Sequence, residues 1–228
     1  MGDQANDYLH SLMELQTFSW SLFDRMPVVG ILRNIHPDTV YRLVPAYQAA
    51  GLTTLEITMN TPGAASIIET LSRQYNGRLN IGAGTVRNTS DLEAALKAGA
   101  GFIVTPVLDE QVIKECVKLG IPVFPGAYTP TEIYRAWHLG APVVKVFPAT
   151  SLGAGYFKDV LAPLNDIKLM PTGGVSLDTI PGFHKAGAVA YGIGGPLFDK
   201  ELIRKEDWEG LERHFRKFST LVSELRAE

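Results

Sequence analysis

Cysteine, histidine and long apolar runs are scarce in this sequence of 228 residues. Its single cysteine, Cys116, excludes an internal disulfide and fits a reducing compartment. Cys116 lies in an apolar helical pattern, which indicates a small core residue rather than a nucleophile. No apolar stretch approaches the roughly 18 residues of a membrane span, and the N-terminus lacks the basic and apolar regions of a signal peptide. We therefore expect a cytoplasmic protein with no membrane partner.

Excess charge is also lacking, because the formal net charge is -3 at pH 7. This balance gives no reason to expect nucleic acid as a partner. The five histidines form no His-x-His or His-Glu-x-x-His spacing, so the sequence gives little support to metal catalysis. No nucleophile elbow is present, and the run from Gly82 to Thr85 is too short for a dinucleotide-binding fingerprint.

Apolar strand candidates alternate with helical patterns along the whole chain. The strand candidates are 28–33, 53–59, 79–85, 102–107, 122–128, 142–149, 168–173 and 188–195. Glycines end several of the predicted helices: Gly51, Gly99, Gly120, Gly140 and Gly187. The last helix is expected from about Asp207 to Leu225. This alternation predicts a single α/β domain over residues 1–228, a (β/α)₈ TIM barrel, and a doubly wound open sheet is the competing architecture.

An additional amphipathic helix is predicted ahead of the first strand. Its apolar residues recur at helical spacing over residues 6–24, and the Met26-Pro27 step ends it. We assign residues 1–26 to an N-terminal helical extension. It is expected to cover the bottom of the barrel or to pack on its side.

Lys145 stands in the middle of the apolar strand 142–149. Strand side chains alternate, so Val143, Lys145 and Phe147 share one face. One interpretation is an edge-strand lysine that extends to solvent. The other is a buried lysine, whose pKa burial would lower until the amine can attack a carbonyl and form a Schiff base. The apolar flanks favour the buried lysine.

Glu56 is the second unusual strand residue. The strand places Leu55 and Ile57 on one face and Thr54, Glu56 and Thr58 on the other. In an antiparallel sheet the polar face would lie in water, but a parallel barrel covers both faces. Glu56 would then point into the interior, with Lys145 and Arg33 as candidate partners, and could move protons during carbinolamine formation, dehydration and C–C cleavage. Burial would raise its pKa and the cations would lower it, and sequence leaves that balance open.

Glycine clusters follow the seventh and eighth strands. They are Thr172-Gly173-Gly174 and Gly192-Ile193-Gly194-Gly195. Tight turns alone would explain a Gly-Gly pair. Loops after these two strands, however, commonly form a phosphate site in such barrels, because their backbone N–H groups face the anion.

Taken in order, these stretches resemble the 2-keto-3-deoxy-6-phosphogluconate aldolase / 4-hydroxy-2-oxoglutarate aldolase family of class I aldolases. The matching stretches are Ile31-Leu32-Arg33, Leu55-Glu56-Ile57-Thr58, Gly82-Ala83-Gly84-Thr85-Val86, Phe102-Ile103-Val104-Thr105-Pro106, Pro125-Gly126, Val144-Lys145-Val146-Phe147-Pro148-Ala149 and Pro171-Thr172-Gly173-Gly174-Val175. The resemblance implies a homotrimer of (β/α)₈ barrels. It also implies cleavage of 2-keto-3-deoxy-6-phosphogluconate to pyruvate and glyceraldehyde 3-phosphate, with 4-hydroxy-2-oxoglutarate as a further substrate.

The same resemblance assigns roles to individual residues. Lys145 matches the Schiff-base lysine and Glu56 the general acid/base. Residues around the pyruvate moiety are matched by Arg33, Thr85, Pro106 and Phe147. The rim for the phosphate-bearing end is matched by Thr172, Gly173, Gly174, Gly194 and Gly195. No metal or organic cofactor is implied.

Two positions bear on the substrate. Asn60, in the Asn60-Thr61-Pro62 form, resembles members that act on the galactonate epimer, whereas Thr172 favours the gluconate epimer. Pro196 stands where some members have a serine, and proline has no N–H to donate. The alternatives are a 2-keto-3-deoxy-6-phosphogalactonate aldolase, a phosphate-binding barrel isomerase, epimerase or synthase without a covalent intermediate, and a non-catalytic barrel that only binds a sugar acid.

Overall fold

The structure is a computed structural model in which residues 17–227 are described. Its strands are β1 Val28–Leu32, β2 Thr54–Thr58, β3 Asn80–Gly84, β4 Ile103–Val104, β5 Val123–Phe124, β6 Gly126–Ala127, β7 Val144–Val146, β8 Leu169–Pro171 and β9 Tyr191–Ile193. Its helices are α2 Trp20–Arg25, α3 Pro37–Ala49, α4 Ala64–Gln74, α5 Thr89–Lys97, α6 Glu110–Lys118, α7 Pro130–His138, α8 Gly153–Leu161, α9 Ile180–Lys185, α10 Lys200–Arg204 and α11 Trp208–Ala227.

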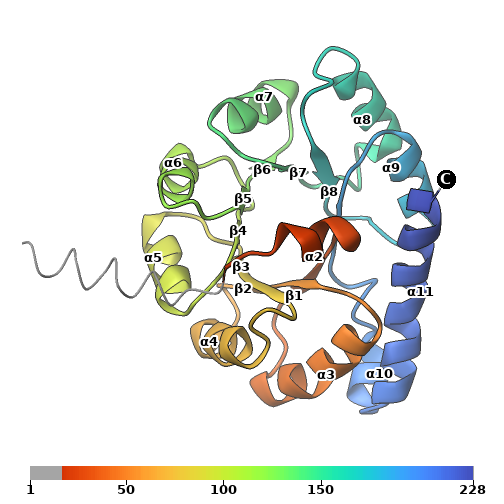
Figure 1. The fold of residues 1–228 in the computed structure, drawn as a ribbon. Helices are drawn as coiled ribbons and strands as arrows, with labels where there is room; N and C mark the ends of the chain where they lie inside the picture. Colours follow the sequence, from red (N-terminus) through yellow and green to blue (C-terminus); the bar gives the residue numbers. More distant parts are fainter. Residues whose placement is uncertain (1–16, 228) are drawn as a thin grey trace, which may run out of the picture.

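The strands pair in parallel, and helices α3 to α11 lie outside them (Figure 1). One sheet has the order β5-β4-β3-β2-β1-β9, and the second has the order β6-β7-β8. Only Pro125 separates β5 from β6, and a parallel bridge pairs Thr172 with Gly192 beyond β8. The result is an α/β fold whose parallel strands form a half-barrel arrangement.

Sequence periodicity located the strands but not their ends. The predicted strand 122–128 is divided into β5 and β6, because Pro125 has no N–H for the ladder. Helix α10 was not predicted at all. The five glycines expected to end helices, Gly51, Gly99, Gly120, Gly140 and Gly187, all have positive φ. No described helix is long and apolar enough to cross a membrane.

The predicted N-terminal helix 6–24 is only partly tested. Its first part lies outside the described residues, and residues 17–19 are not helical. Helix α2 begins at Trp20, because the Ser19 side chain accepts a hydrogen bond from the Leu22 N–H and caps the first turn. A continuous helix over 6–24 is therefore wrong at residues 17–19.

Two apolar cores follow from the alternation of strand side chains. The larger core lies between strands and helices and contains Val28, Leu55, Val144 and Val146. The smaller core takes the other faces of the strands, at or near their amino ends: Val29, Phe102, Val104, Phe124, Val143, Met170 and Ala190. On each inner face, the residues two and four positions after these core residues lie at the carboxyl end of the strand. The inner side is thus apolar at one end and polar at the other.

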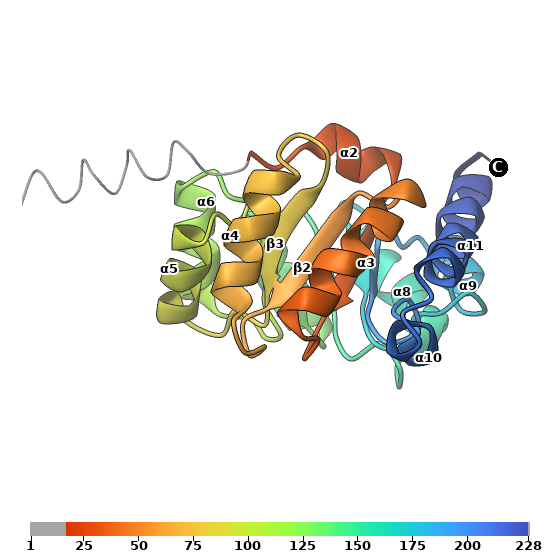
Figure 2. The same cartoon turned by 90° about the horizontal axis from the view of Figure 1, so that it is seen from below.

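Helix α2 closes the apolar end of the smaller core (Figure 2). Phe18 and Phe23 are buried there, with ring centroids 5.4 Å from Phe102 and Phe124 respectively. The buried Asn80 side chain fixes the segment: its Oδ1 accepts from the Ser19 N–H at 2.7 Å and its Nδ2 donates to the Ser19 carbonyl at 3.0 Å. Helix α2 and Phe18 thus cover this end of the smaller core.

Candidate active site

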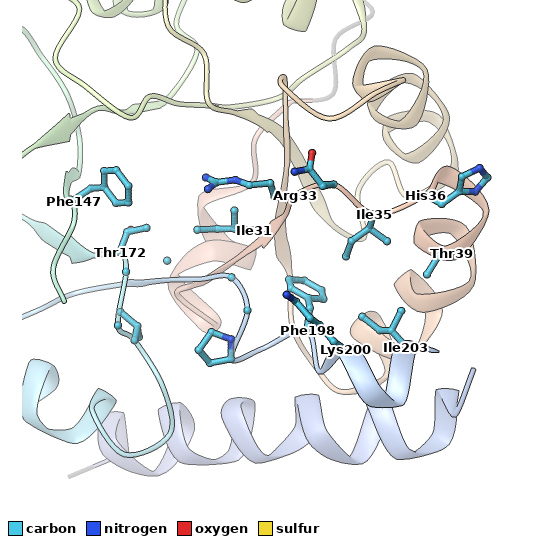
Figure 3. Close-up of a pocket in the computed structure, with 18 of the residues that line it drawn as sticks. Ile31, Arg33, Ile35, His36, Thr39, Phe147, Thr172, Phe198, Lys200 and Ile203 are labelled. Carbon is cyan, nitrogen blue, oxygen red and sulfur yellow. The ribbon is translucent and has the colours of Figure 1, made fainter. Parts of the chain in front are cut away.

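A cavity of about 750 Å³ lies at the carboxyl ends of the strands (Figure 3). Its position follows from the inner columns of side chains. In β1 the column runs from Val29 in the smaller core to Ile31 and Arg33 on the cavity wall. Seven residues expected at the site line it together: Arg33, Phe147, Thr172, Gly173, Gly174, Gly194 and Gly195.

Lys145 lies in the column that connects the smaller core to this cavity. Val143 belongs to that core, Lys145 is next on the same face, and Phe147 lines the cavity. The Lys145 side chain is 4% exposed, and its Nζ lies 4.9 Å from the centroid of the Phe147 ring. Burial lowers the pKa of Lys145; Glu56 opposes this shift and Arg33 adds to it. The exposed edge-strand interpretation of Lys145 is wrong.

Glu56 is buried as well, at 1% exposure, and its Oε2 has no hydrogen-bond partner in the structure. Burial raises the pKa of Glu56, and the charges of Lys145 and Arg33 only partly offset it. The structure therefore decides the balance that sequence left open: desolvation outweighs the two cations. A carboxyl group with a raised pKa keeps its proton to higher pH, so it can act as an acid as well as a base.

These two groups supply complementary chemistry. The lowered pKa of Lys145 increases the fraction of neutral amine, which is the form that attacks a carbonyl carbon. The raised pKa of Glu56 favours a carboxyl that can protonate a departing hydroxyl and then accept a proton. Each changes the pKa of the other through its charge, so they lie within electrostatic reach. Arg33 acts on both and also lines the cavity.

The glycine rim forms another part of the cavity wall. Gly173 and Gly174 have φ of 89° and 71°, in the left-handed region that favours glycine. A Cβ at Gly174 would also lie 3.0 Å from Thr150. The Thr172 hydroxyl is buried at this rim without a hydrogen-bond partner. Thr172 therefore lines the cavity with a hydroxyl oxygen that is itself covered by protein.

Five expected residues are not part of the cavity lining. Lys145 and Glu56 are buried behind it, and the other three are Asn60, Thr85 and Pro106. Asn60 is exposed after β2, Thr85 is half-buried after β3 with φ of 56°, and Pro106 follows β4. These three residues stand at the carboxyl ends of neighbouring strands but do not line the cavity. Their roles stay predictions.

The cavity also has a side that sequence reasoning missed. Lys200, Ile203 and Arg204 of α10 line it, together with Phe198 just before the helix. Asp199 was the available signal, because its side chain accepts from the N–H groups of Glu201 and Leu202 and caps α10. An aspartate followed by a short amphipathic stretch is a weak sign, and α10 has only five residues.

Comparison with known proteins finds relatives that are aldolases of one family. The sequence profile of the family "KDPG and KHG aldolase" matches residues 21–214. The 2-dehydro-3-deoxy-6-phosphogalactonate aldolase of Escherichia coli is 34% identical over 76% of this chain and 85% of its own length. The 2-dehydro-3-deoxy-phosphogluconate aldolase of Pseudomonas aeruginosa is 34% identical over 88% of this chain and 90% of its own length.

A solved structure adds the chemistry of the relatives. The KDPG aldolase of Legionella pneumophila, with pyruvate captured as a covalent carbinolamine intermediate, superposes with a TM-score of 0.79. It is 25% identical, and the match covers 87% of this chain and 97% of that one.

Proposed function

The chain belongs to the family of KDPG and KHG aldolases, and from this premise we propose that it cleaves 2-keto-3-deoxy-6-phosphogluconate to pyruvate and glyceraldehyde 3-phosphate. It acts as a class I aldolase. The observation that carries the proposal is the buried amine of Lys145, with its lowered pKa, against the Phe147 ring on the cavity wall.

The proposed reaction starts at the keto group. The neutral amine of Lys145 adds to C2 and forms a carbinolamine, and Glu56 gives the proton with which the hydroxyl leaves as water. Glu56 then accepts the proton of the C4 hydroxyl as the C3–C4 bond breaks, and the bonding electrons pass into the protonated imine to form a neutral enamine. Protonation of the enamine at C3 and hydrolysis of the imine release pyruvate and the free lysine.

The remaining site residues fit around this substrate. In our proposal Arg33, Thr85, Pro106 and Phe147 surround the pyruvate moiety, and Asn60 contributes from the neighbouring loop. The distal phosphate lies at the rim formed by Thr172, Gly173, Gly174, Gly194 and Gly195, whose backbone N–H groups suit an anion.

The galactonate epimer is the second candidate substrate, because a relative named for the galactonate epimer and one named for the gluconate epimer are both 34% identical to this chain. The sequence feature that favours the galactonate epimer is Asn60, in the Asn60-Thr61-Pro62 form. Thr172 argues for gluconate, and Thr172 lines the cavity whereas Asn60 does not. We therefore place the gluconate epimer first, with 4-hydroxy-2-oxoglutarate as an additional substrate.

Closure of the sheet and assembly of the protein are part of the same proposal. The bridge from Thr172 to Gly192 and the single residue between β5 and β6 support a closed (β/α)₈ barrel over the whole chain. Exposed aromatic residues on and beside α7, namely Tyr128, Tyr134 and Trp137, support burial against further copies in a homotrimer. We place the enzyme in the cytoplasm.

Borohydride reduction in the presence of pyruvate tests the reaction. It should add one reduced pyruvyl group, which peptide mapping locates on Lys145. Lys145→Met should abolish both labelling and turnover, whereas Lys168→Met, at another lysine of the chain, should label normally. No label, or a label on a surface lysine such as Lys158, would contradict the Schiff-base mechanism and favour a non-covalent barrel enzyme or a sugar-acid-binding protein.

A further inference from the structure

Four basic side chains line the cavity: Arg33, His36, Lys200 and Arg204. Two of them are engaged by neighbours on their own elements. The His36 Nδ1 accepts a hydrogen bond from the Asp38 N–H at 3.4 Å, as the cap of α3. The Arg204 guanidinium donates to the Glu201 carboxylate at 2.7 Å.

Arg33 acts through its charge on Lys145 and Glu56, the two proposed catalytic residues. Its charge lowers the pKa of Lys145 and also that of Glu56. Neither Arg33 nor Lys200 makes a hydrogen bond or ion pair within the residues that the structure describes, but the charge of Lys200 acts on neither Lys145 nor Glu56. Among the basic residues of the lining, Lys200 is the one whose charge is left for a bound molecule.

Lys200 lies on the side of the cavity formed by Phe198 and Ile203 (Figure 3). The chain reaches it directly from the glycine rim, through Gly194, Gly195 and Pro196. Its long side chain has three rotatable N–H donors, so it can follow a ligand at the rim. Lys200 and the rim therefore face one shared volume.

The rim alone is a weak phosphate site in this chain. Pro196 lines the cavity but has no N–H to donate, so the rim after β9 loses one backbone donor. A phosphate ester carries about -1.5 to -2 charges at pH 7, and backbone N–H groups offer only partial positive charge. A full positive charge elsewhere on the cavity wall, such as that of Lys200, offsets this deficit.

We propose that Lys200 binds the distal phosphate of the substrate and sets the enzyme's preference for phosphorylated over unphosphorylated keto-deoxy acids. This inference rests on the proposed aldolase function and adds a residue outside the stretches on which that function depends. Lys200 is a specificity-determining residue in this role, since it does not contact the reacting carbonyl.

The test compares cleavage of 2-keto-3-deoxygluconate with and without its 6-phosphate. Lys200→Gln should lower kcat/KM for the phosphorylated substrate about tenfold, the value of one exposed charge-assisted hydrogen bond. It should leave kcat/KM for the unphosphorylated substrate unchanged. Lys200→Arg should keep most of the preference. Added salt should narrow the gap between wild type and Lys200→Gln, because it screens the exposed charge.

Lys205→Gln is the matched control, since Lys205 follows the same short helix but does not line the cavity. It should keep the wild-type preference. Equal losses on both substrates, or an unchanged preference in Lys200→Gln, would overturn the proposal. Borohydride trapping of pyruvate on Lys145 should be normal in Lys200→Gln. If trapping fails in the wild-type protein as well, the result contradicts the aldolase function rather than the role of Lys200.

Discussion

A Cβ placed on Gly84 would lie 2.3 Å from Oε1 of Glu56 and 2.6 Å from its carboxyl carbon. The two residues stand on neighbouring strands, because β2 pairs with β3 in parallel. Only a residue without a side chain leaves room for the carboxyl at this point. The glycine of β3 is thus part of what holds Glu56 in place.

Gly84→Ala should displace the Glu56 carboxyl while leaving the fold intact. A misplacement of about 1 Å can cost on the order of 10²-fold in rate, so we expect kcat to fall by about that factor. Gly155→Ala is the control, because no heavy atom would meet its Cβ within 4 Å in helix α8. It should keep kcat and add up to about 1 kcal/mol of stability. Equal kcat in both variants would contradict the steric argument.

Glu56→Gln should keep the fold and still allow some pyruvate trapping on Lys145, but it should lose most turnover. General acid–base groups contribute about 10²–10⁴-fold to rate, and the amide cannot exchange a proton. Steady-state kinetics and borohydride labelling measure the two effects separately. Glu69→Gln changes an exposed carboxylate of α4 paired with Arg73 and should be neutral. A near-normal kcat in Glu56→Gln would make Glu56 only a partner for the charge of Lys145.

The pH dependence of pyruvate trapping should report the pKa of Lys145. Only the neutral amine reacts, so the trapping rate should rise with pH, with a midpoint below the ordinary lysine value of about 10.4. Glu56 raises this pKa and Arg33 lowers it. Removing the carboxylate in Glu56→Gln should therefore move the midpoint down, and Arg33→Gln should move it up. Shifts of the same sign in both variants would contradict the electrostatic assignment.

The alternation of strand side chains made most of the site predictable. Val143, Lys145 and Phe147 were expected on one face and were found in one inner column. The same alternation puts Ile31 and Arg33 on one side of the chain at β1, and both line the cavity. A period of two fixes which side chains share a face without any knowledge of the neighbours.

The features that could not be predicted from the sequence depend on contacts between elements that are distant along the chain. The pKa of Glu56 is raised because the effect of its complete burial exceeds the opposing effect of two cations, Lys145 and Arg33, which come from other parts of the chain. Lys200 was missed because α10 is short and its wall position depends on the path of the chain after β9. The clamp of Asn80 on Ser19 joins residues 61 positions apart.

That clamp makes its own prediction. Asn80→Ala removes hydrogen bonds to the Ser19 N–H and carbonyl and to the Thr54 hydroxyl. Leaving such groups without partners costs about 1–3 kcal/mol, so the free energy of unfolding should fall by that amount in urea denaturation. Asn76→Ala, at an exposed position beyond α4, should have little effect. A loss below about 0.5 kcal/mol would mean that water replaces Asn80 at Ser19.

Thr172→Val should separate stability from specificity. The Thr172 hydroxyl is buried at the rim without a partner, and such a group costs stability that a similar apolar side chain avoids. The free energy of unfolding should therefore stay equal or rise slightly. A substrate hydroxyl would satisfy Thr172, so kcat/KM for the gluconate epimer should fall about tenfold, with a smaller loss for the galactonate epimer.

The epimer ratio is the decisive measurement for Thr172→Val, with Thr220→Val on the exposed face of α11 as the control. A narrowed ratio with unchanged stability would assign the hydroxyl to the substrate. An unchanged epimer ratio together with a lower free energy of unfolding would make Thr172 a structural residue. It packs against Gly192, where a Cβ would lie 2.3 Å from the Thr172 Oγ1. A large galactonate preference in the wild type would transfer the stereochemical role to Asn60, because Thr172 would then not be the residue that selects the epimer.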